Sequence, residues 1–328
     1  MPQLARNASK DLRGTTMVTC LILGGGGFIG SHLAEALLMR DYHVRVFDNF
    51  QGGIDNLSTV RNRVEIVKGD FLSKKDLASA CTGVDYLFHY ISTTVPATAR
   101  LDPIHDISTN LEGTVRLLQT AVDNKVKRIF FPSSGGTIYG EPQHLPVPET
   151  EPVKPTDPYG ISKLAIERYL HYFYAAYGLD FMIFRYSNPY GQRQNPFGKQ
   201  GVIPIFLNKV KNDERPVIYG DGTMLRDYIY IQDAIDATMA LLEIKTDEKV
   251  FNIGSGIGTS INELLLIMST VTGKRIVPNY MPGDKQYVQK IVLDISKIRR
   301  ETGWQPRISL EDGIRNTWNW LNETGGAI

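Results

Sequence analysis

The chain has 328 residues, of which 42% are hydrophobic and 22% charged, and its formal net charge is +1. Acids and bases are mixed along the chain without a basic block, which argues against nucleic acid and anionic membranes as partners. The length exceeds that of most single domains, so we expect one large domain with a smaller lobe appended.

The ends and the cysteines of the chain indicate a cytoplasmic protein. Residues 1–16 are polar and lack the apolar core of a secretory signal, so we predict a flexible N-terminal tail. No apolar run approaches the roughly 20 residues that a membrane span requires. Cys20 and Cys81 have neither metal-ligand nor redox-pair spacing, which favours buried thiols in a reducing compartment and predicts no metal site.

Apolar runs alternate with stretches of helical spacing through the first half of the chain. The expected strands are 18–23, 43–48, 64–67, 84–89, 128–131 and 180–185, and the expected helices include 28–39, 111–124 and 157–178. Strands that alternate with helices form a parallel sheet covered on both faces. The sequence therefore predicts an α/β fold, a Rossmann-type doubly wound parallel sheet, over residues 17–186.

The pattern changes after residue 186, and we expect residues 187–328 to form mainly a smaller α/β substrate-binding lobe. Residues 188–201 are rich in Gly, Pro, Asn and Gln, which predicts a binding loop rather than a folded element. Helices are expected at 202–211, 233–242, 261–272 and 310–322, and strands at 217–219 and 250–253. The strand at 250–253 is expected to return to the large sheet.

Three glycines separate the first expected strand from the first expected helix. Gly24, Gly27 and Gly30 form the pattern G-x-x-G-x-x-G. The first permits a tight turn, the second lets the backbone approach a pyrophosphate at the helix N-terminus, and the third allows close packing of helix and strand. At the start of a strand–helix series this predicts a dinucleotide site, to which Phe28 and Ile29 of the first helical turn belong.

A carboxylate after the second strand indicates which dinucleotide binds. Asp48, followed by Asn49, can accept hydrogen bonds from the adenosine ribose and would repel the 2′-phosphate of NADP, so we predict NAD. Asp48 could instead cap a turn. Asp70 and Phe71 follow the third strand and could reach the adenine, although a capping role for Asp70 is nearly as well supported.

Tyr159 and Lys163 lie four residues apart at the start of an expected helix, so both side chains fall on one face. Tyrosine is a poor base at neutral pH. A fixed ammonium beside it favours the phenolate and suits it to take a proton from an alcohol. The spacing is common by itself and becomes specific after a glycine fingerprint.

Many ordered motifs of the chain resemble the extended short-chain dehydrogenase/reductase family, above all the UDP-sugar 4-epimerases. They lie at residues 24–33, 48–49, 110–114, 133–140, 159–163, 185–191, 220–222, 226–228, 251–254 and 303–306. The resemblance implies NAD as cofactor and a nucleotide sugar, most naturally UDP-linked, as substrate. It also implies a homodimer built from helices around 111–121 and 162–174, with which Leu164, Ile166 and Leu170 are compatible, although these three could simply face the sheet.

The resemblance also implies a role for individual residues. Tyr159 would be the acid/base, and Lys163 would hold the nicotinamide ribose. Asn188 would contact the sugar nucleotide, and Arg226 would bind its diphosphate through charge-assisted hydrogen bonds. The alternative for Arg226 is an ion pair with Asp227 or Asp221.

The chain departs from the family pattern in four places. The Leu-Ala-Ala that follows the fourth strand is here Tyr90-Ile91-Ser92, whose neighbouring hydroxyls lie near the expected nicotinamide or serve only the turn. The third catalytic hydroxyl falls on Gly135, so Ser134 or Thr137 would have to supply it, and we slightly prefer Ser134 because it adjoins that position. A second diphosphate-binding arginine falls on Asp284 or, under another alignment, on Met281, and Lys285 is its candidate replacement. The residue that limits room beside the sugar is Ile291 instead of an aromatic, which would admit an N-acetylated hexose.

The reaction follows from the residues before Tyr139. Related 4,6-dehydratases and UDP-glucuronate decarboxylases carry carboxylates there, whereas this chain has Gly136 and Thr137. We therefore expect a 4-epimerase of a UDP-hexose or UDP-N-acetylhexosamine that works through a 4-keto intermediate. A decarboxylase or dehydratase is the alternative, and a non-catalytic NAD-sensing scaffold is the alternative outside the enzymes.

Overall fold

The computed structural model describes residues 17–53, 55–283 and 288–325. The predicted tail, residues 1–16, lies outside these ranges. Among the described residues, no helix combines the length and the apolar character needed to cross a membrane. Cys20 and Cys81 are free and buried, and burial raises the pKa of both thiols.

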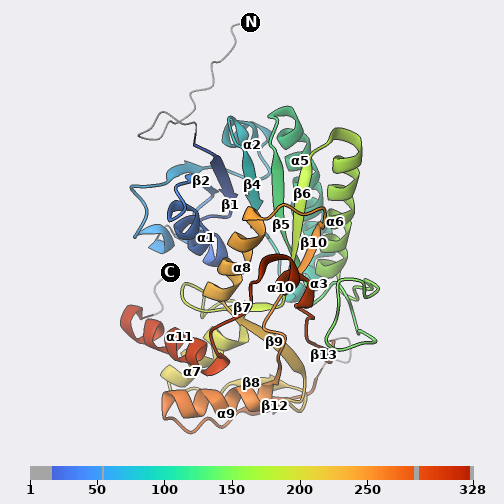
Figure 1. Cartoon of the computed structure of the whole chain (residues 1–328). Coiled ribbons are helices and arrows are strands. Elements are labelled where there is room, and N and C mark those ends of the chain that lie inside the picture. The colour runs from blue at the N-terminus through green and yellow to red at the C-terminus, as the bar shows by residue number, and fades with distance from the viewer. Residues whose placement is uncertain (1–16, 54, 284–287, 326–328) are drawn as a thin grey trace, which may run out of the picture. The chain divides into compact units, whose positions relative to one another are not determined.

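A seven-stranded parallel sheet confirms the predicted α/β fold, in the strand order β10-β6-β5-β4-β1-β2-β3 (Figure 1). Its strands are β1 (Thr19–Leu23), β2 (His43–Asp48), β3 (Glu65–Lys68), β4 (Tyr86–His89), β5 (Arg128–Ser134), β6 (Asp180–Tyr186) and β10 (Val250–Ile253). Five consecutive residue pairs join β1 to β2 in parallel register, from Thr19–His43 to Leu23–Phe47. All of β1 is buried, as expected of a central strand covered on both faces. The predicted return of residues 250–253 to the sheet is confirmed.

Helices connect the strands of this sheet. They are α1 (Phe28–Leu38), α2 (Lys74–Cys81), α3 (Pro96–Leu101), α4 (Pro103–Asp106), the π-helical η2 (Ile107–Glu112), α5 (Gly113–Asp123) and α6 (Pro158–Tyr177), with a 3₁₀ turn, η1, at Asp55–Leu57. The sequence analysis missed α2, whose short span shows no clear apolar periodicity. Its start is nevertheless marked, because the Ser73 hydroxyl accepts a hydrogen bond from the N–H of Asp76 at 3.3 Å.

The second half of the chain forms smaller sheets and further helices. The strands are β7 (Asn188–Tyr190), β8 (Val217–Tyr219), β9 (Leu225–Tyr230), β11 (Gly258–Ser260), β12 (Asn279–Met281) and β13 (Lys290–Ile291). The helices are α7 (Val202–Lys211), α8 (Ile231–Glu243), α9 (Ile261–Thr272), α10 (Ser296–Thr302) and α11 (Leu310–Thr324). The prediction of an unstructured loop from residue 188 is wrong for its first three residues, since β7 pairs in parallel with β9.

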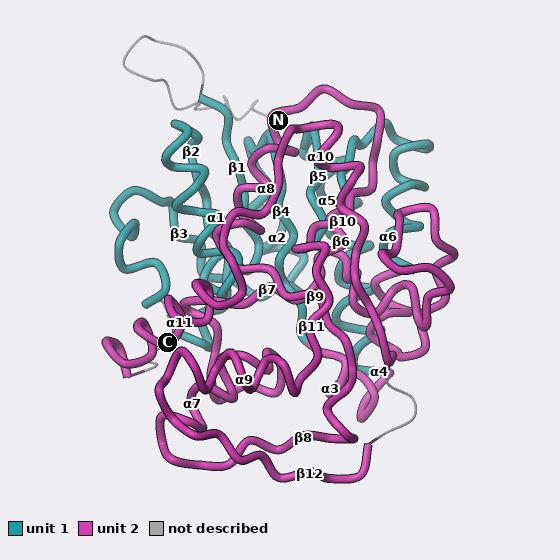
Figure 2. Tube along the Cα trace, turned by 60° about the horizontal axis from the view of Figure 1, so that its bottom comes forward, with its two compact units in different colours: residues 1–93, 104–132, 165–183 teal, residues 94–103, 133–164, 184–328 magenta. Residues whose placement is uncertain are grey.

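The chain divides into two compact units (Figure 2). The first comprises residues 1–93, 104–132 and 165–183, and the second comprises residues 94–103, 133–164 and 184–328. The core of the first unit includes Leu21, Ile22 and Val46, which are fully buried. In the second unit, Ile138, Tyr139, Val147, Ile291 and Leu293 form a buried cluster. The predicted domain limits, 17–186 and 187–328, stay a prediction.

Candidate active site

The glycine turn after β1 has steric properties that only glycine supplies. Gly24 has a φ of +80°, and a Cβ there would lie 2.9 Å from the carbonyl carbon of Tyr90. A Cβ on Gly30 would lie 2.3 Å from the carbonyl oxygen of Gly24. The Gly27 N–H closes the turn by donating to the same oxygen at 3.1 Å. A side chain on Gly24 would therefore collide with the backbone after β4, and one on Gly30 would push α1 away from the turn.

The N-terminus of α1 meets a cavity of about 570 Å³ within the first unit. Gly24 and Gly27 line this cavity, and Phe28 and Ile29 form the first helical turn. Gly27 is the N-cap of α1, and no side chain in the described part of the chain caps it. The N–H groups of a first helical turn lack helical partners and carry partial positive charge, so they favour an anionic group such as a pyrophosphate.

Asp48 and Asn49 line the same cavity. One oxygen of the Asp48 carboxylate accepts from the N–H of Gly26 at 3.0 Å, and the other accepts from the N–H of Phe50 at 2.9 Å. The turn-capping alternative is therefore observed, and it ties the carboxylate to the glycine turn. Since a carboxylate has about four acceptor sites, these two bonds leave acceptors for ribose hydroxyls.

Asp70 and Phe71 form another part of the cavity wall. An oxygen of the Asp70 carboxylate accepts from the N–H of Leu72 at 2.9 Å, so the capping role that the sequence left open is present. The Phe71 ring is buried, with its centroid 5.1 Å from that of the His89 ring. A part for either residue in binding the adenine stays a prediction.

A π-helical turn, η2, contributes to the cavity wall, and most of it precedes the helix expected at 111–124. The side-chain oxygen of Asn110 in η2 accepts from the N–H of Thr93 at 2.9 Å. The hydroxyls of Thr93 and Thr109, both of which line the cavity, lie 2.5 Å apart. Such turns are rare and frequently occur at functional sites. The sequence analysis missed this turn, because one extra residue per turn barely alters apolar periodicity.

Helix α6 presents Tyr159 and Lys163 in its first two turns. The buried carboxylate of Asp157 accepts from the N–H of Gly160 at 2.9 Å, and Pro158 opens the helix, as is typical of helix starts. The Lys163 ammonium lies 5.5 Å from the centre of the Tyr159 ring. Lys163 is 7% exposed. A buried ammonium thus lies near the Tyr159 ring, and the role of the two residues as an acid/base pair stays a prediction.

Leu293 packs beside Gly135, the position to which the family pattern assigns the third catalytic hydroxyl. A Cβ on Gly135 would lie 2.6 Å from Cδ1 of Leu293 and 3.0 Å from the carbonyl oxygen of Tyr186. The Gly135 N–H donates to that oxygen at 2.7 Å, so the backbone has little freedom to move. A serine at position 135 would therefore require Leu293 to shift.

The two candidate replacements, Ser134 and Thr137, have different neighbours. A Cβ on Gly136 would lie 3.9 Å from the Ser134 hydroxyl and 4.0 Å from the side-chain oxygen of Asn188, so these two polar groups flank one small space. Thr137 packs against the first turn of α6, because a Cβ built on Gly160 would lie 3.3 Å from the Cβ of Thr137. The Thr137 hydroxyl is buried and has no hydrogen-bond partner among the described residues.

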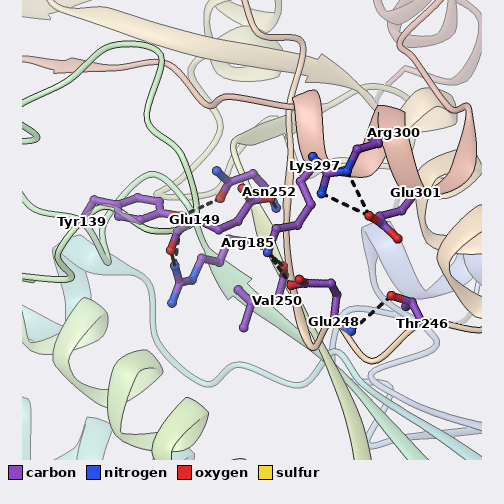
Figure 3. A network of polar contacts seen from close by, with 10 residues as sticks. All are labelled: Tyr139, Glu149, Arg185, Thr246, Glu248, Val250, Asn252, Lys297, Arg300 and Glu301. Atoms are coloured by element: carbon purple, nitrogen blue, oxygen red, sulfur yellow. Dashed lines mark hydrogen bonds and ion pairs between the residues drawn. The ribbon is translucent and has the colours of Figure 1, made fainter.

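A buried polar network fixes the segment that follows β5 (Figure 3). The Tyr139 hydroxyl donates to the side-chain oxygen of Asn252 at 2.7 Å and accepts from Arg185 at 3.0 Å. The Asn252 amide in turn donates to the carbonyl of Asp294 at 3.3 Å. The network therefore connects Tyr139, in the segment after β5, to β6, to β10 and to Asp294, the residue after Leu293.

Asn188 and Arg226 line one cavity of about 220 Å³ within the second unit. The Asn188 amide donates to the carbonyl of Asp227 at 2.8 Å. The Arg226 guanidinium donates to the carbonyls of Leu225 at 2.8 Å and Val288 at 2.7 Å. Burial lowers the pKa of this guanidinium, as removal of a cation from water does.

The ion-pair alternative for Arg226 is not observed. Asp227 accepts instead from the N–H and the hydroxyl of Ser255, both at 2.7 Å. Asp221 accepts from Thr223. Among the residues that the structure describes, Arg226 is held by backbone carbonyls and pairs with no carboxylate.

The other predicted substrate residue that the structure describes, Ile291, does not line this cavity. Ile291 is 1% exposed and belongs to the buried cluster around Tyr139, because β13 pairs with β9 and turns it inward. Its role beside a sugar stays a prediction. Lys285 lies outside the described residues.

Comparisons with known proteins agree over nearly the whole chain. The model of the NAD dependent epimerase/dehydratase family matches residues 20–254. A curated relative, the putative UDP-glucose 4-epimerase of Methanocaldococcus jannaschii, is 37% identical over 303 residues, 92% of this chain and 97% of that protein.

Two solved structures show the same agreement in three dimensions. The UDP-glucose 4-epimerase of Thermotoga maritima with UDP-glucose matches at a TM-score of 0.88 and 36% identity, covering 94% of this chain and 99% of that one. The UDP-N-acetylglucosamine 4-epimerase of Methanobrevibacter ruminantium, in complex with UDP-N-acetylmuramic acid, matches at a TM-score of 0.87 and 31% identity. The match covers 94% of this chain and 99% of that one.

Proposed function

The chain belongs to the NAD-dependent epimerase/dehydratase family, and we propose that it is a 4-epimerase of a UDP-linked hexose or N-acetylhexosamine. The observation that carries this proposal is the Tyr159–Lys163 pair of α6, with the ammonium 5.5 Å from the phenol ring. A non-catalytic NAD sensor would have no use for that pair. The two relatives of known structure are 4-epimerases by name, which supports the same reaction.

The first unit supplies residues that fit a dinucleotide. The glycine turn leaves room for a pyrophosphate at the start of α1, and the Asp48 carboxylate retains acceptors for the adenosine ribose. When bound, NAD⁺ supplies an acceptor for the hydride of the sugar C4 and later the hydride that returns. The role of the protein is then to hold the sugar and to move one proton.

Tyr159 moves this proton in the proposed mechanism. Its phenolate, stabilised by the Lys163 ammonium, takes the proton of the 4-hydroxyl as the 4-keto sugar forms. The keto sugar turns to present its other face, and Tyr159 returns the proton to the oxygen. Because both the hydride and the proton taken from the sugar are returned to it, the cycle has no net redox change.

The positions before Tyr139 favour epimerisation over dehydration or decarboxylation. Gly136 and Thr137 offer no carboxylate to attack a C5 proton. Glu141, the nearest acid that follows, accepts from the N–H of Gln289 at 2.8 Å. Glu149 accepts from the N–H of Asn252 at 2.9 Å. Both acids therefore already have structural partners.

The reaction is tested by incubating the purified protein with UDP-, CDP-, GDP- and dTDP-sugars and recording NMR spectra. We expect a new anomeric signal from the C4 epimer of a UDP-hexose or UDP-N-acetylhexosamine. A 4-keto-6-deoxy product, or a pentose with release of CO₂, would replace the proposal by dehydration or decarboxylation.

We predict that Asp48 makes the protein prefer NAD to NADP. Asp48→Ala should weaken NAD binding, because it removes acceptors of the ribose hydroxyls and also releases the Gly26 and Phe50 N–H groups. Asp48→Asn is the matched control, since it keeps an acceptor oxygen but removes the charge that repels a 2′-phosphate. Titration of the apo-protein with both dinucleotides measures these effects. Tighter binding of NADP than of NAD by the native protein contradicts the prediction.

The third hydroxyl is assigned by comparing Ser134→Ala with Thr137→Val. We keep Ser134 as the slightly preferred candidate, since it adjoins Gly135 and flanks a space with Asn188. The substitution that removes the third hydroxyl should slow turnover by at least about tenfold, a threshold set below the roughly 10²–10⁴-fold typical of general acid–base catalysis. If both variants turn over at close to the native rate, the hydroxyl lies elsewhere in the chain.

The homodimer and the cytoplasmic location also remain proposals. Ile166 and Leu170 are each 2% exposed, so they pack inside the protein and cannot form the interface. The exposed Ile161, Tyr169 and Tyr172 of α6 are better candidates for contact with a second copy, and sedimentation velocity tests this. The free, buried thiols of the chain support a reducing compartment.

A further inference from the structure

The hydroxyl turn, residues 134–137, carries both candidates for the third catalytic hydroxyl, Ser134 and Thr137. The Ser134 carbonyl closes this turn by accepting from the N–H of Ile138 at 3.0 Å. The two middle residues of the turn are glycines, which restrict the backbone less than any other residue. The positions of both hydroxyls therefore depend on the contacts that hold the two ends of the turn.

The two ends of the hydroxyl turn are held in different ways. At its start, the Gly135 N–H donates to the carbonyl of Tyr186 in β6 at 2.7 Å. At its end, Ile138 and Tyr139 are 0% and 1% exposed and belong to the buried cluster that contains Leu293. Apolar burial is non-directional, so it keeps the Tyr139 ring inside the protein without fixing the direction of the ring. A directional contact at this end has to come from the phenol hydroxyl.

Two residues that are distant in the sequence hold the Tyr139 hydroxyl (Figure 3). It donates to the side-chain oxygen of Asn252 at 2.7 Å and accepts from the guanidinium of Arg185 at 3.0 Å. Asn252 has fixed partners of its own, because its NH₂ group donates to the carbonyl of Val147 at 2.8 Å and its N–H donates to the carboxylate of Glu149 at 2.9 Å. Arg185 and Asn252 are 5% and 0% exposed, and water competes little for hydrogen bonds between such buried groups.

We propose that Tyr139 is a positioning residue for catalysis: by its bonds to Arg185 and Asn252 it sets where the hydroxyl turn presents the third catalytic hydroxyl. The inference rests on the proposed function and goes beyond it, since Tyr139 is 1% exposed and acts without touching the substrate. Only Ile138, which is fully buried, separates Tyr139 from the turn, so a shift of Tyr139 displaces the turn as well. Displacement of a reacting group by about 1 Å can cost on the order of 10² in rate.

Tyr139→Phe tests this role, because it keeps the ring in the buried cluster and removes only the hydroxyl. We expect kcat for the UDP-sugar identified by NMR to fall by about fivefold or more. KM and the affinity for NAD should stay within about twofold of native, since neither ligand contacts Tyr139. A kcat that stays native, or a loss confined to KM, overturns the inference.

The matched control is Tyr230→Phe. Tyr230 also lies in the second unit and is 7% exposed, and its hydroxyl forms a hydrogen bond with the side chain of Asn316. This variant loses a buried hydrogen bond as Tyr139→Phe does, but far along the chain from the hydroxyl turn, so its kcat should equal the native value. An equal fall of kcat in both variants would assign the loss to general destabilisation and overturn the inference.

Double variants show whether Tyr139 acts through the hydroxyl turn. Tyr139→Phe is combined with Ser134→Ala or with Thr137→Val, whichever slows turnover by itself. Once the catalytic hydroxyl is absent, its position no longer matters, so Tyr139→Phe should lower kcat by less than about twofold in that background. Losses that multiply would show independent effects and overturn the inference. Native turnover in both single variants would overturn it too, because the hydroxyl would then lie outside the turn.

Hydrogen exchange of the backbone amides, followed by NMR, separates this inference from the proposed function. Tyr139→Phe should speed exchange of the Ile138 amide, which closes the turn, by about fivefold or more and leave the amides of β1 unchanged. If the native protein forms no C4 epimer, the proposed function fails, and faster exchange confined to the turn still supports its anchoring by Tyr139. Unchanged exchange overturns the inference whatever the product, because the turn is then held without the hydroxyl.

Discussion

Tyr159→Phe is expected to lower kcat by a factor on the order of 10²–10⁴, the usual loss when a general base is removed. Phenylalanine keeps the ring beside Lys163 but removes the hydroxyl that takes the proton of the sugar. The fold and the affinity for NAD should remain, because the glycine turn and Asp48 are untouched. Turnover of the UDP-sugar by NMR and titration of the apo-protein with NAD measure the two parts of this expectation.

The matched control for this substitution is Tyr169→Phe. Tyr169 lies on the same helix and is 40% exposed, so loss of its hydroxyl should leave kcat at the native value. A Tyr159→Phe variant whose kcat stays within tenfold of native would remove Tyr159 as the acid/base, and the proton acceptor would have to be sought among the hydroxyls of Ser134 and Thr137.

Arg226→Ala is expected to raise KM for the nucleotide sugar by about tenfold to a hundredfold. The prediction assumes that the guanidinium binds the diphosphate. A hydrogen bond to a charged group contributes roughly 1.5–3 kcal/mol, and with the family's second arginine absent from this chain, Arg226 has to carry most of the recognition. Lys285→Ala should have a smaller effect of the same sign. Steady-state kinetics with the UDP-sugar identified by NMR measure both variants.

A second variant separates binding from folding, because Arg226 also holds the carbonyls of Leu225 and Val288. Arg226→Lys retains the charge but loses the planar fork, so its KM should lie between those of the native protein and Arg226→Ala. The free energy of unfolding of each variant, from urea titration, reports the structural part. If Arg226→Ala folds and its KM equals the native value, the diphosphate lies elsewhere.

Much of the fold could be predicted from local patterns. The strands at 43–48, 217–219 and 250–253 and the helices at 202–211 and 261–272 occur with the expected bounds, because periodic burial and helix caps are properties of neighbouring residues. For α9 the Ser260 hydroxyl accepts from the N–H of Glu263 at 3.2 Å, a capping box that is visible in the sequence. The short strands β7 and β13 were missed, since each exists only because β9 pairs with it.

The glycine turn of the candidate cofactor site was also predictable from local sequence. Gly24 needs a positive φ and Gly30 needs the absence of a Cβ, and these are requirements of single positions that leave a trace in the residue type. The spacing of Tyr159 and Lys163 likewise implies one helical face. The sequence offered turn capping by Asp48 and Asp70 only as an alternative to ligand binding, and the structure shows the capping bonds while leaving acceptors on each carboxylate.

The sequence by itself determined the fold class, the glycine turn and the Tyr159–Lys163 pair, since each depends on residues within a few positions of one another. Only the tertiary structure decided that Leu293 fills the space at Gly135, that Ile291 lies in a buried cluster, and that the Tyr139 hydroxyl meets polar residues of β6 and β10. The physical reason is that packing and hydrogen-bond satisfaction depend on which distant segments meet. Residue type constrains each partner only weakly, because a leucine fits many cores and a hydroxyl is satisfied by many neighbours.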